Sequence, residues 1–185
     1  MKINWHPGHM AKTKRLMQQD IRQIDLICEL LDARIPAASS NPELAALAGQ
    51  KKRMIVLNRA DQADPDKTER WKSYFQRQGL PAVALDSKSG GGYQQLIPQI
   101  RQVMADWLAR NEQKGLKGRS VRIMACGIPN VGKSSFINRA LGRRSAVAED
   151  RPGGTRQKHW FALKGGVELM DTPGMLWPRI DDEQT

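Results

Sequence analysis

The sequence is poor in cysteine and contains no long apolar run. Its two cysteines among 185 residues, Cys28 and Cys126, have a spacing that matches no zinc or redox motif. Each lies in an apolar run, so we expect both thiols to be buried and unpaired in a reducing compartment. No apolar stretch reaches the roughly 20 residues that a membrane-spanning helix requires. These absences argue against a zinc or disulfide scaffold and against a membrane protein.

The N-terminus lacks the features of a targeting segment. Residues 1–20 contain no apolar core followed by the small-residue cleavage site of a secretory signal. They also lack the Ser- and Arg-rich, acid-poor composition of a transit peptide. We therefore expect a cytoplasmic protein.

Acidic residues are too few to balance the basic ones. The sequence has 19 Asp and Glu against 30 Lys and Arg, which gives a net charge of +11. Such a charge attracts polyanions, because each cation placed at a phosphate releases a condensed counterion. A soluble surface that is merely positive is the alternative, but the excess is local, which favours a polyanionic partner. The basic clusters are Lys12, Lys14, Arg15 and Arg22; Lys114, Lys117, Arg119 and Arg122; and Arg139, Arg143, Arg144, Arg151, Arg156 and Lys158.

Apolar runs alternate with amphipathic segments, which predicts a mostly parallel sheet with helices on both faces. Lys164-Gly165-Gly166 is typical of a hairpin, so the last two strands are expected to be antiparallel. A polar, basic linker is expected at 111–119, and a loop at 33–42. The expected strands are 24–32, 53–58, 81–85, 121–127, 158–164 and 167–171, and the expected helices are 10–23, a short one opened by Asn41-Pro42, 65–78, 93–110 and 133–142.

The segment GIPNVGKS at 127–134 fits the pattern G-x-x-x-x-G-K-[ST], between a predicted strand and a predicted helix. Backbone N–H groups of such a loop surround phosphate oxygens, and the following helix presents its positive end to the same anion. Lys133 would reach the β- and γ-phosphates, and the Ser134 hydroxyl would coordinate Mg²⁺. A glycine-containing turn with an incidental lysine is the alternative, which the strand–loop–helix context disfavours. The predicted phosphate-binding residues are Asn130, Val131, Gly132, Lys133, Ser134 and Ser135.

The segment NRAD at 58–61 follows another apolar strand, as the guanine-recognition motif N-K-x-D does. A carboxylate at Asp61 can accept hydrogen bonds from N1–H and the 2-amino group of guanine, a pair that adenine lacks. An Asn- and Asp-rich turn is the alternative for the tetrapeptide alone. Arg59 stands where the motif has Lys, and its aliphatic stem can lie along the base. The segment DSKS at 86–89 resembles the S-A-K loop that meets guanine O6, so the predicted base-binding residues are Asn58, Arg59, Asp61, Ser87 and Lys88.

Two further segments complete a set of GTPase motifs. DTPG at 171–174 matches D-x-x-G, where Asp171 would hold Mg²⁺ through water and the Gly174 N–H would meet the γ-phosphate. Thr155 lies where a switch threonine coordinates Mg²⁺. The guanine motifs thus precede the phosphate loop, whereas ordinary Ras-like domains begin with that loop. We predict an α/β P-loop NTPase (Ras-like) G domain, circularly permuted, with a six-stranded mostly parallel sheet and residues 111–119 joining the former ends.

The whole chain resembles the YlqF/RbgA family of circularly permuted GTPases, the ribosome biogenesis GTPase A group. The resemblance is carried by WHPGHM at 5–10, LDARIP at 31–36, PGGTR at 152–156 and DTPG at 171–174. It implies a monomeric GTPase that acts in late assembly of the large ribosomal subunit, with rRNA as its partner, and a C-terminal helical RNA-binding domain. The expected organisation is a basic helical extension at 1–23, a permuted G domain in G4-G5-G1-G2-G3 order at 24–178, and the start of a truncated C-terminal region at 179–185.

The hydrolytic residue is not given by the motifs. Ras-like enzymes orient the attacking water with a Gln after D-x-x-G, but this sequence has Met175 there. The resemblance implies His9 instead, whose neutral imidazole can accept a proton from water; packing against the helix start is the alternative role. The resemblance also implies a K⁺ ion at Asn130. A P-loop ATPase, an rRNA-binding scaffold with little catalysis and a tRNA-modification GTPase remain as rival functions.

Overall fold

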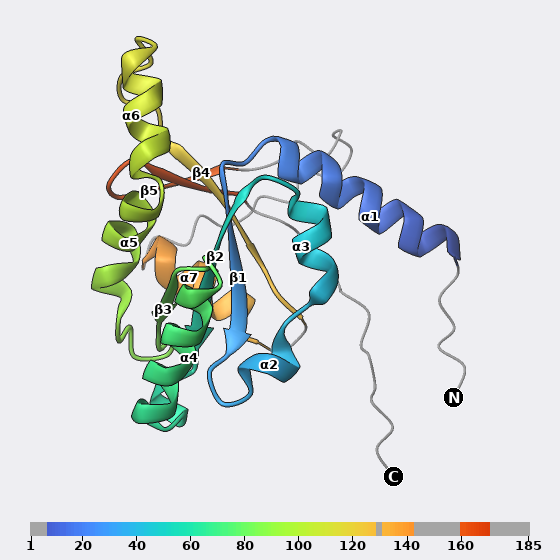
Figure 1. Ribbon diagram of the computed structural model, residues 1–185, viewed down its shortest axis with the longest axis vertical. Coiled ribbons are helices and arrows are strands. Elements are labelled where there is room, and N and C mark those ends of the chain that lie inside the picture. Colours follow the sequence, from blue (N-terminus) through green and yellow to red (C-terminus); the bar gives the residue numbers. More distant parts are fainter. Residues whose placement is uncertain (1–6, 129–130, 143–159, 171–185) are drawn as a thin grey trace.

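The computed structural model describes residues 7–128, 131–142 and 160–170, apart from the side chains of residues 7–10 and 13 (Figure 1). In this part of the chain, one 6-stranded sheet has the order β3-β2-β1-β4-β6-β5. All neighbouring strands are parallel except β5 and β6, which form the predicted antiparallel hairpin. The strands are β1 Leu26–Asp32, β2 Lys52–Asn58, β3 Ala82–Ala84, β4 Val121–Cys126, β5 Trp160–Leu163 and β6 Val167–Met170.

Helices cover both faces of the sheet, as predicted (Figure 1). One face packs against α1, α3 and α4, and the other against α5, α6 and α7. Two 3₁₀ turns, η1 Ala60–Gln62 and η2 Tyr93–Gln95, lie beyond the ends of β2 and β3. The helices are α1 Pro7–Arg22, α2 Pro36–Ser39, α3 Pro42–Ala48, α4 Pro65–Arg77, α5 Leu96–Val103, α6 Ala105–Gln113 and α7 Lys133–Leu141.

The continuous apolar run of β1 follows from its central position. Every residue of β1 is buried, because successive side chains point to opposite faces and both faces carry helices. Leu30 belongs to a core with Ile100 of α5 and Phe136 of α7. On the opposite face, Ile27 packs with residues of α1 and α3, and Leu31 packs with residues of α4. The prediction of a strand buried on both faces is therefore confirmed.

A buried ion pair lies on the face of the sheet that carries α1, α3 and α4. Glu29 of β1 is 3% exposed and lies 3.6 Å from Nη1 of Arg53 in β2. Its carboxylate also accepts hydrogen bonds from the Asn41 N–H at 3.2 Å and the Ser40 hydroxyl at 3.4 Å. Burial raises the pKa of Glu29, while the contacts from Asn41, Arg53 and Ser40 oppose that rise. The pair thereby anchors the entry to α3 onto the sheet.

The two cysteines are buried and unpaired, as predicted. Burial raises the pKa of the Cys28 thiol to about 12 and also raises the pKa of Cys126. Both thiols therefore stay neutral and act as small apolar side chains. Among the described residues, no helix is long and apolar enough to cross a membrane.

The single long helix predicted at 93–110 is wrong. Residues 93–95 form η2, and the rest divides at Met104 into α5 and α6. The Lys52 ammonium donates to the carbonyl oxygen of Val103 at 3.0 Å, a contact from a distant strand that sequence periodicity does not reveal. Pro98 lies in the first turn of α5, where its missing N–H costs least, so the helix begins only shortly before it. The loop expected at 33–42 likewise contains a single helical turn, α2.

The β5–β6 hairpin depends on glycine at its tip. Gly165 and Gly166 have φ of 81° and 76°, in the left-handed region. A Cβ on Gly165 would lie 2.5 Å from Cγ2 of Ile97 in α5, and Nη1 of Arg101 donates to the Gly165 carbonyl at 2.7 Å. The hairpin is therefore packed closely against α5.

Gly165→Ala should destabilise the protein more than Gly115→Ala does. Both glycines have φ of 81°, but nothing lies within 4 Å of a Cβ on Gly115. Gly115→Ala should therefore cost only the backbone strain, about 1–2 kcal/mol of unfolding free energy, whereas Gly165→Ala should cost about 1–3 kcal/mol more through the clash with Ile97. Urea denaturation measures both values, and equal losses would show that the close approach carries no energetic weight.

Candidate functional site

The predicted motifs meet at one edge of the sheet. Segment 58–61 follows β2, segment 86–89 follows β3 and segment 127–134 follows β4. Strands β2 and β4 are both parallel to β1, and β3 is parallel to β2. The carboxyl ends of β2, β3 and β4 therefore point the same way. From β1 the chain proceeds outward to β2 and β3, and then returns to place β4 on the other side of β1. Such a reversal of strand order is where open α/β sheets bind ligands.

The phosphate loop approaches the side chain of Asn58 closely. Gly132 has φ of 88°, and a Cβ there would lie 2.4 Å from Nδ2 of Asn58. A residue other than glycine would thus need both a strained backbone and a displaced Asn58. The second glycine of the motif is required by this contact.

The amino end of α7 suits an anion. The helix begins at Lys133, and its first hydrogen bond runs from the Phe136 N–H to the Gly132 carbonyl at 2.8 Å. The N–H groups of residues 133–135 precede that bond and have no acceptor within the helix. Ser134 and Ser135 are exposed in this turn, while the buried Phe136 fixes the helix in the core. This turn therefore offers oriented N–H groups, a lysine and two hydroxyls, which are the groups that bind phosphate at helix N-termini.

The Asn58 side chain links three loops. It is 1% exposed, and its Nδ2 donates to the Val131 carbonyl at 2.9 Å. Its Oδ1 accepts from the Ser87 hydroxyl at 2.7 Å, and that hydroxyl lies 2.8 Å from the hydroxyl of Tyr93. The loops that follow β2, β3 and β4 are thus joined by side-chain hydrogen bonds. Burial raises the pKa of Tyr93 to about 12, so this hydroxyl stays protonated.

Arg59 adopts a conformation that is rare for a non-glycine residue. Its φ of 60° and ψ of 35° lie in the left-handed region, directly before η1. The turn is tied to the end of β3, because the Ala60 N–H donates to the Leu85 carbonyl at 3.1 Å. Asp61 is exposed within η1. Nη1 of Arg59 lies 3.7 Å from Oδ2 of Asp32.

Asp32, at the end of β1, holds the arginine of the motif and a second arginine. Nε and Nη2 of Arg34 donate to its two oxygens at 3.0 and 2.7 Å. The hydrogen bonds from Arg34 lower the pKa of Asp32, and the charge of Arg59 lowers it further. The Asp32 N–H donates to the Ser39 hydroxyl at 2.9 Å, which fixes the turn that follows β1. Sequence reasoning quoted Asp32 in the family motif but assigned it no function.

Arg139 of α7 reaches across to the loop at 86–89. Its Nε donates to the Ser87 carbonyl at 3.2 Å, and its Nη2 donates to the Lys88 carbonyl. Within the loop, Asp86 accepts from the Lys88 N–H at 2.9 Å and from the Ser89 hydroxyl, and the bond from Ser89 is the main cause of its lowered pKa. The helix of the phosphate loop is therefore fastened to the predicted guanine loop. Sequence reasoning had placed Arg139 only among the basic residues.

The structure places some of the predicted site residues together and leaves others untested. Asn58, Ser87 and Val131 are connected directly, and Gly132 contacts Asn58. The backbone of His9 lies in the first turn of α1, but its side chain is not described. The predicted residues that lie outside the described ranges are Asn130, Thr155, Asp171 and Gly174.

Comparison with known proteins gives a consistent result. Residues 122–185 match the family model described as "50S ribosome-binding GTPase". The chain is 42% identical to ribosome biogenesis GTPase A of Priestia megaterium over 99% of its own length, and it spans 64% of the length of that relative. It is similar to the GNP-bound crystal structure of YlqF from T. maritima, with a TM-score of 0.65 and 27% identity over 92% of this chain and 60% of that one. The GDP-bound structure of the same protein gives a TM-score of 0.64 and 27% identity over 90% and 60%.

Asn58→Ala should destabilise the protein far more than Asn111→Ala. The change at 58 leaves the Val131 carbonyl and the Ser87 hydroxyl without their partner in a buried place, which costs about 2–3 kcal/mol of unfolding free energy. Asn111 donates only to the Trp107 carbonyl at 3.0 Å within partly buried α6. Its loss should therefore cost under about 1 kcal/mol. Chemical denaturation of both variants is the measurement, and equal losses would contradict the linking role of Asn58.

Proposed function

We propose that this chain is a circularly permuted GTPase of the kind represented by ribosome biogenesis GTPase A, to which it is similar. In this proposal it binds GTP and GDP, hydrolyses GTP and serves as an assembly factor for the large ribosomal subunit. The observation that carries the proposal is the hydrogen-bonded junction of segment 58–61, segment 86–89 and the phosphate loop through Asn58. This junction positions base recognition and phosphate recognition beside each other. The rRNA partner is consistent with the net charge of +11.

In the proposed complex, the 58–61 turn recognises the base. Asp61 accepts hydrogen bonds from N1–H and the 2-amino group of guanine, and adenine would leave its carboxylate unpaired. The stem of Arg59 lies along the base while Asp32 holds its guanidinium. Ser87 and Lys88 meet guanine O6 through a loop that Arg139 keeps in place. Guanine selectivity therefore favours a GTPase over the rival P-loop ATPase.

The amino end of α7 holds the phosphates in this proposal. Lys133 and the N–H groups of residues 133–135 bind the β- and γ-phosphates. The exposed hydroxyl of Ser134 fits Mg²⁺, because it is a hard oxygen donor at the same turn, and Thr155 and Asp171 would complete the coordination. A bound Mg²⁺ neutralises charge on the β- and γ-phosphate oxygens. The Gly174 N–H would contact the γ-phosphate, and Asn130 would hold K⁺.

Turnover is proposed to be slow unless the ribosome stimulates it. Met175 cannot orient water, so His9 is assigned to accept the proton of the attacking water. The first turn of α1 would then have to approach the γ-phosphate in the stimulated state. Ribosome binding would supply this arrangement.

Asp61→Asn should convert the base preference from guanine to xanthine. The amide of Asn would donate toward the 2-position, where guanine carries an amino donor and xanthine a carbonyl acceptor. Competition between labelled GDP and unlabelled xanthosine diphosphate measures the change, which should reach about a hundredfold or more in relative affinity. Asp66→Asn, the same substitution in the exposed first turn of α4, is the matched control. Unchanged guanine preference at position 61 would contradict the assignment, and tight ATP binding by the parent chain would favour the ATPase.

His9→Ala should lower the GTPase rate measured with large ribosomal subunits by about a hundredfold, within the range of general-base catalysis. GTP affinity should stay unchanged, because the imidazole is assigned to the water and not to the nucleotide. His159→Ala, to which the sequence assigns no role, is the control. If both variants retain the parent rate, His9 is not catalytic, and a parent chain that subunits do not stimulate would favour the scaffold function.

A further inference from the structure

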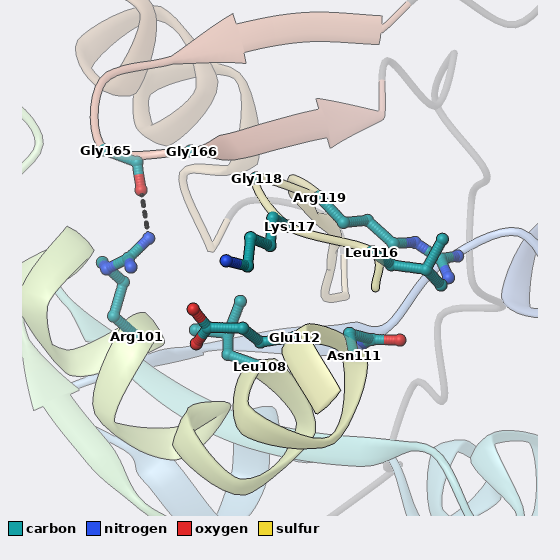
Figure 2. A pocket seen from close by; sticks show the side chains of 10 residues that line it. All are labelled: Arg101, Leu108, Asn111, Glu112, Leu116, Lys117, Gly118, Arg119, Gly165 and Gly166. Carbon is teal, nitrogen blue, oxygen red and sulfur yellow. Dashed lines mark hydrogen bonds between the residues drawn. The ribbon is translucent and has the colours of Figure 1, made fainter. Parts of the chain in front are cut away.

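A second surface lies at the opposite end of β4 from the phosphate loop. A pocket of about 420 Å³ lies between α6, the segment 116–119 and the β5–β6 hairpin (Figure 2). The phosphate loop follows Cys126 at one end of β4, whereas this pocket adjoins Val121 at the other. At about 3.3 Å per residue, Val121 and Cys126 are separated by roughly 17 Å. The pocket residues therefore cannot serve the nucleotide phosphates.

The pocket is positively charged. Arg101, Lys117 and Arg119 line it, and Glu112 is the carboxylate that faces them. The surrounding segment 101–122 carries six Lys and Arg against two Asp and Glu, and all six cations are exposed. Lys164 adds a further exposed cation on the hairpin. The excess charge is thus gathered on the chain segment that includes the join of the permuted domain.

These cations are held in place without being neutralised. Nη1 of Arg101 donates to the uncharged carbonyl of Gly165 at 2.7 Å, and the guanidinium of Arg119 lies 5.4 Å from the centre of the Trp107 ring. Lys117 extends toward the middle of the pocket (Figure 2). Within the ranges that the structure describes, none of the three forms an ion pair with a carboxylate. Charge that is oriented but unpaired is suited to an external anion.

We propose that this pocket and its basic surroundings form a binding site for the sugar–phosphate backbone of RNA. Lys117 and Arg101 meet phosphate oxygens, and the guanidinium of Arg119, which lies over the Trp107 ring, offers a planar group on which an unpaired base stacks. Leu116, exposed by 48%, gives that base an apolar neighbour. The inference rests on the proposed ribosomal function only for the source of the RNA, since the site itself is separate from the nucleotide.

RNA fits the surface better than a membrane or an acidic protein does. Leu116 is one of four exposed large apolar side chains among the described residues, too few for a membrane-binding face. An acidic peptide would use the charges but not the stacked pair of Arg119 and Trp107. Phosphate contacts position a nucleic acid without reading its sequence, so this site should bind RNA with little sequence preference.

The test compares two doubly substituted variants of the full 185-residue chain. Lys117→Gln/Arg119→Gln removes two pocket cations, and Lys67→Gln/Arg70→Gln removes one Lys and one Arg from exposed positions of α4. Both lower the net charge equally. The probe is a fluorescein-labelled single-stranded RNA of about 20 nucleotides, titrated at several salt concentrations. Unfolding free energy and GTP binding are measured in parallel to confirm intact folding.

The pocket variant should bind RNA about tenfold more weakly, because it loses the phosphate contact of Lys117 and the stacking surface of Arg119. Its slope of log affinity against log salt should fall by roughly 0.7, the value for one lost phosphate contact. The α4 variant should change affinity by less than about twofold, because distant charges are screened. Equal losses in both variants, or no loss in either, would overturn the proposal. The same loss toward polyglutamate or phosphatidylserine vesicles would also overturn the assignment to RNA. If the parent chain failed to bind GTP but the two variants still differed in RNA affinity as expected, the GTPase proposal would be overturned and the RNA-binding proposal would be retained.

Discussion

Asn58 lies almost fully buried where the ends of β2, β3 and β4 meet, and both polar atoms of its side chain are used to hold them together. The two partners, Ser87 and Val131, are 29 and 73 residues away in sequence. A buried amide without hydrogen-bond partners costs more free energy than its hydrogen bonds contribute when they are formed. Each of the three loops is therefore held in the position that keeps the Asn58 side chain bonded. Arg139 adds to this hydrogen-bond network, because it links α7 to the loop after β3. The geometry of the candidate site is therefore a collective property of segments that lie far apart in the chain.

Much of this arrangement could be predicted from local patterns. The apolar run of β1 and the Gly165-Gly166 tip of the hairpin each specify their structure through the buried or left-handed positions that their residues fit. The phosphate loop was recognisable for the same reason. Features set by distant contacts could not be found this way. The break at Met104 accompanies a bond from Lys52, and the functions of Asp32, Tyr93 and Arg139 in the site depend on partners in other loops. Hydrophobic periodicity does not indicate contacts between residues that are distant in sequence. A motif contains only the residues that many proteins share, so it does not include these partners.

The two ends of β4 have different chemical surroundings. At its carboxyl end, glycines, backbone N–H groups and the start of α7 form a compact site in which each group has a fixed position. At its amino end, long cationic side chains surround a wider pocket. Dense backbone donors suit a small, highly charged ligand, while exposed side-chain cations suit a polymer whose phosphates can be met in several registers. One strand thus separates the proposed nucleotide site from the proposed RNA-binding surface.

The pairing of β1 with both β2 and β4 has a consequence for synthesis on the ribosome. Leu26 pairs with Lys52, a partner made soon afterwards, but its other neighbour, Ile123, emerges only 97 residues after it. Until then β1 is an edge strand whose backbone groups and apolar side chains have no neighbour on that side. A nascent chain therefore carries an unfinished sheet while these 97 residues are added, with an exposed edge open to aggregation or to chaperones. Because the phosphate loop and the strand before it come late in the chain, the second side of β1 stays unpaired until β4 has been made.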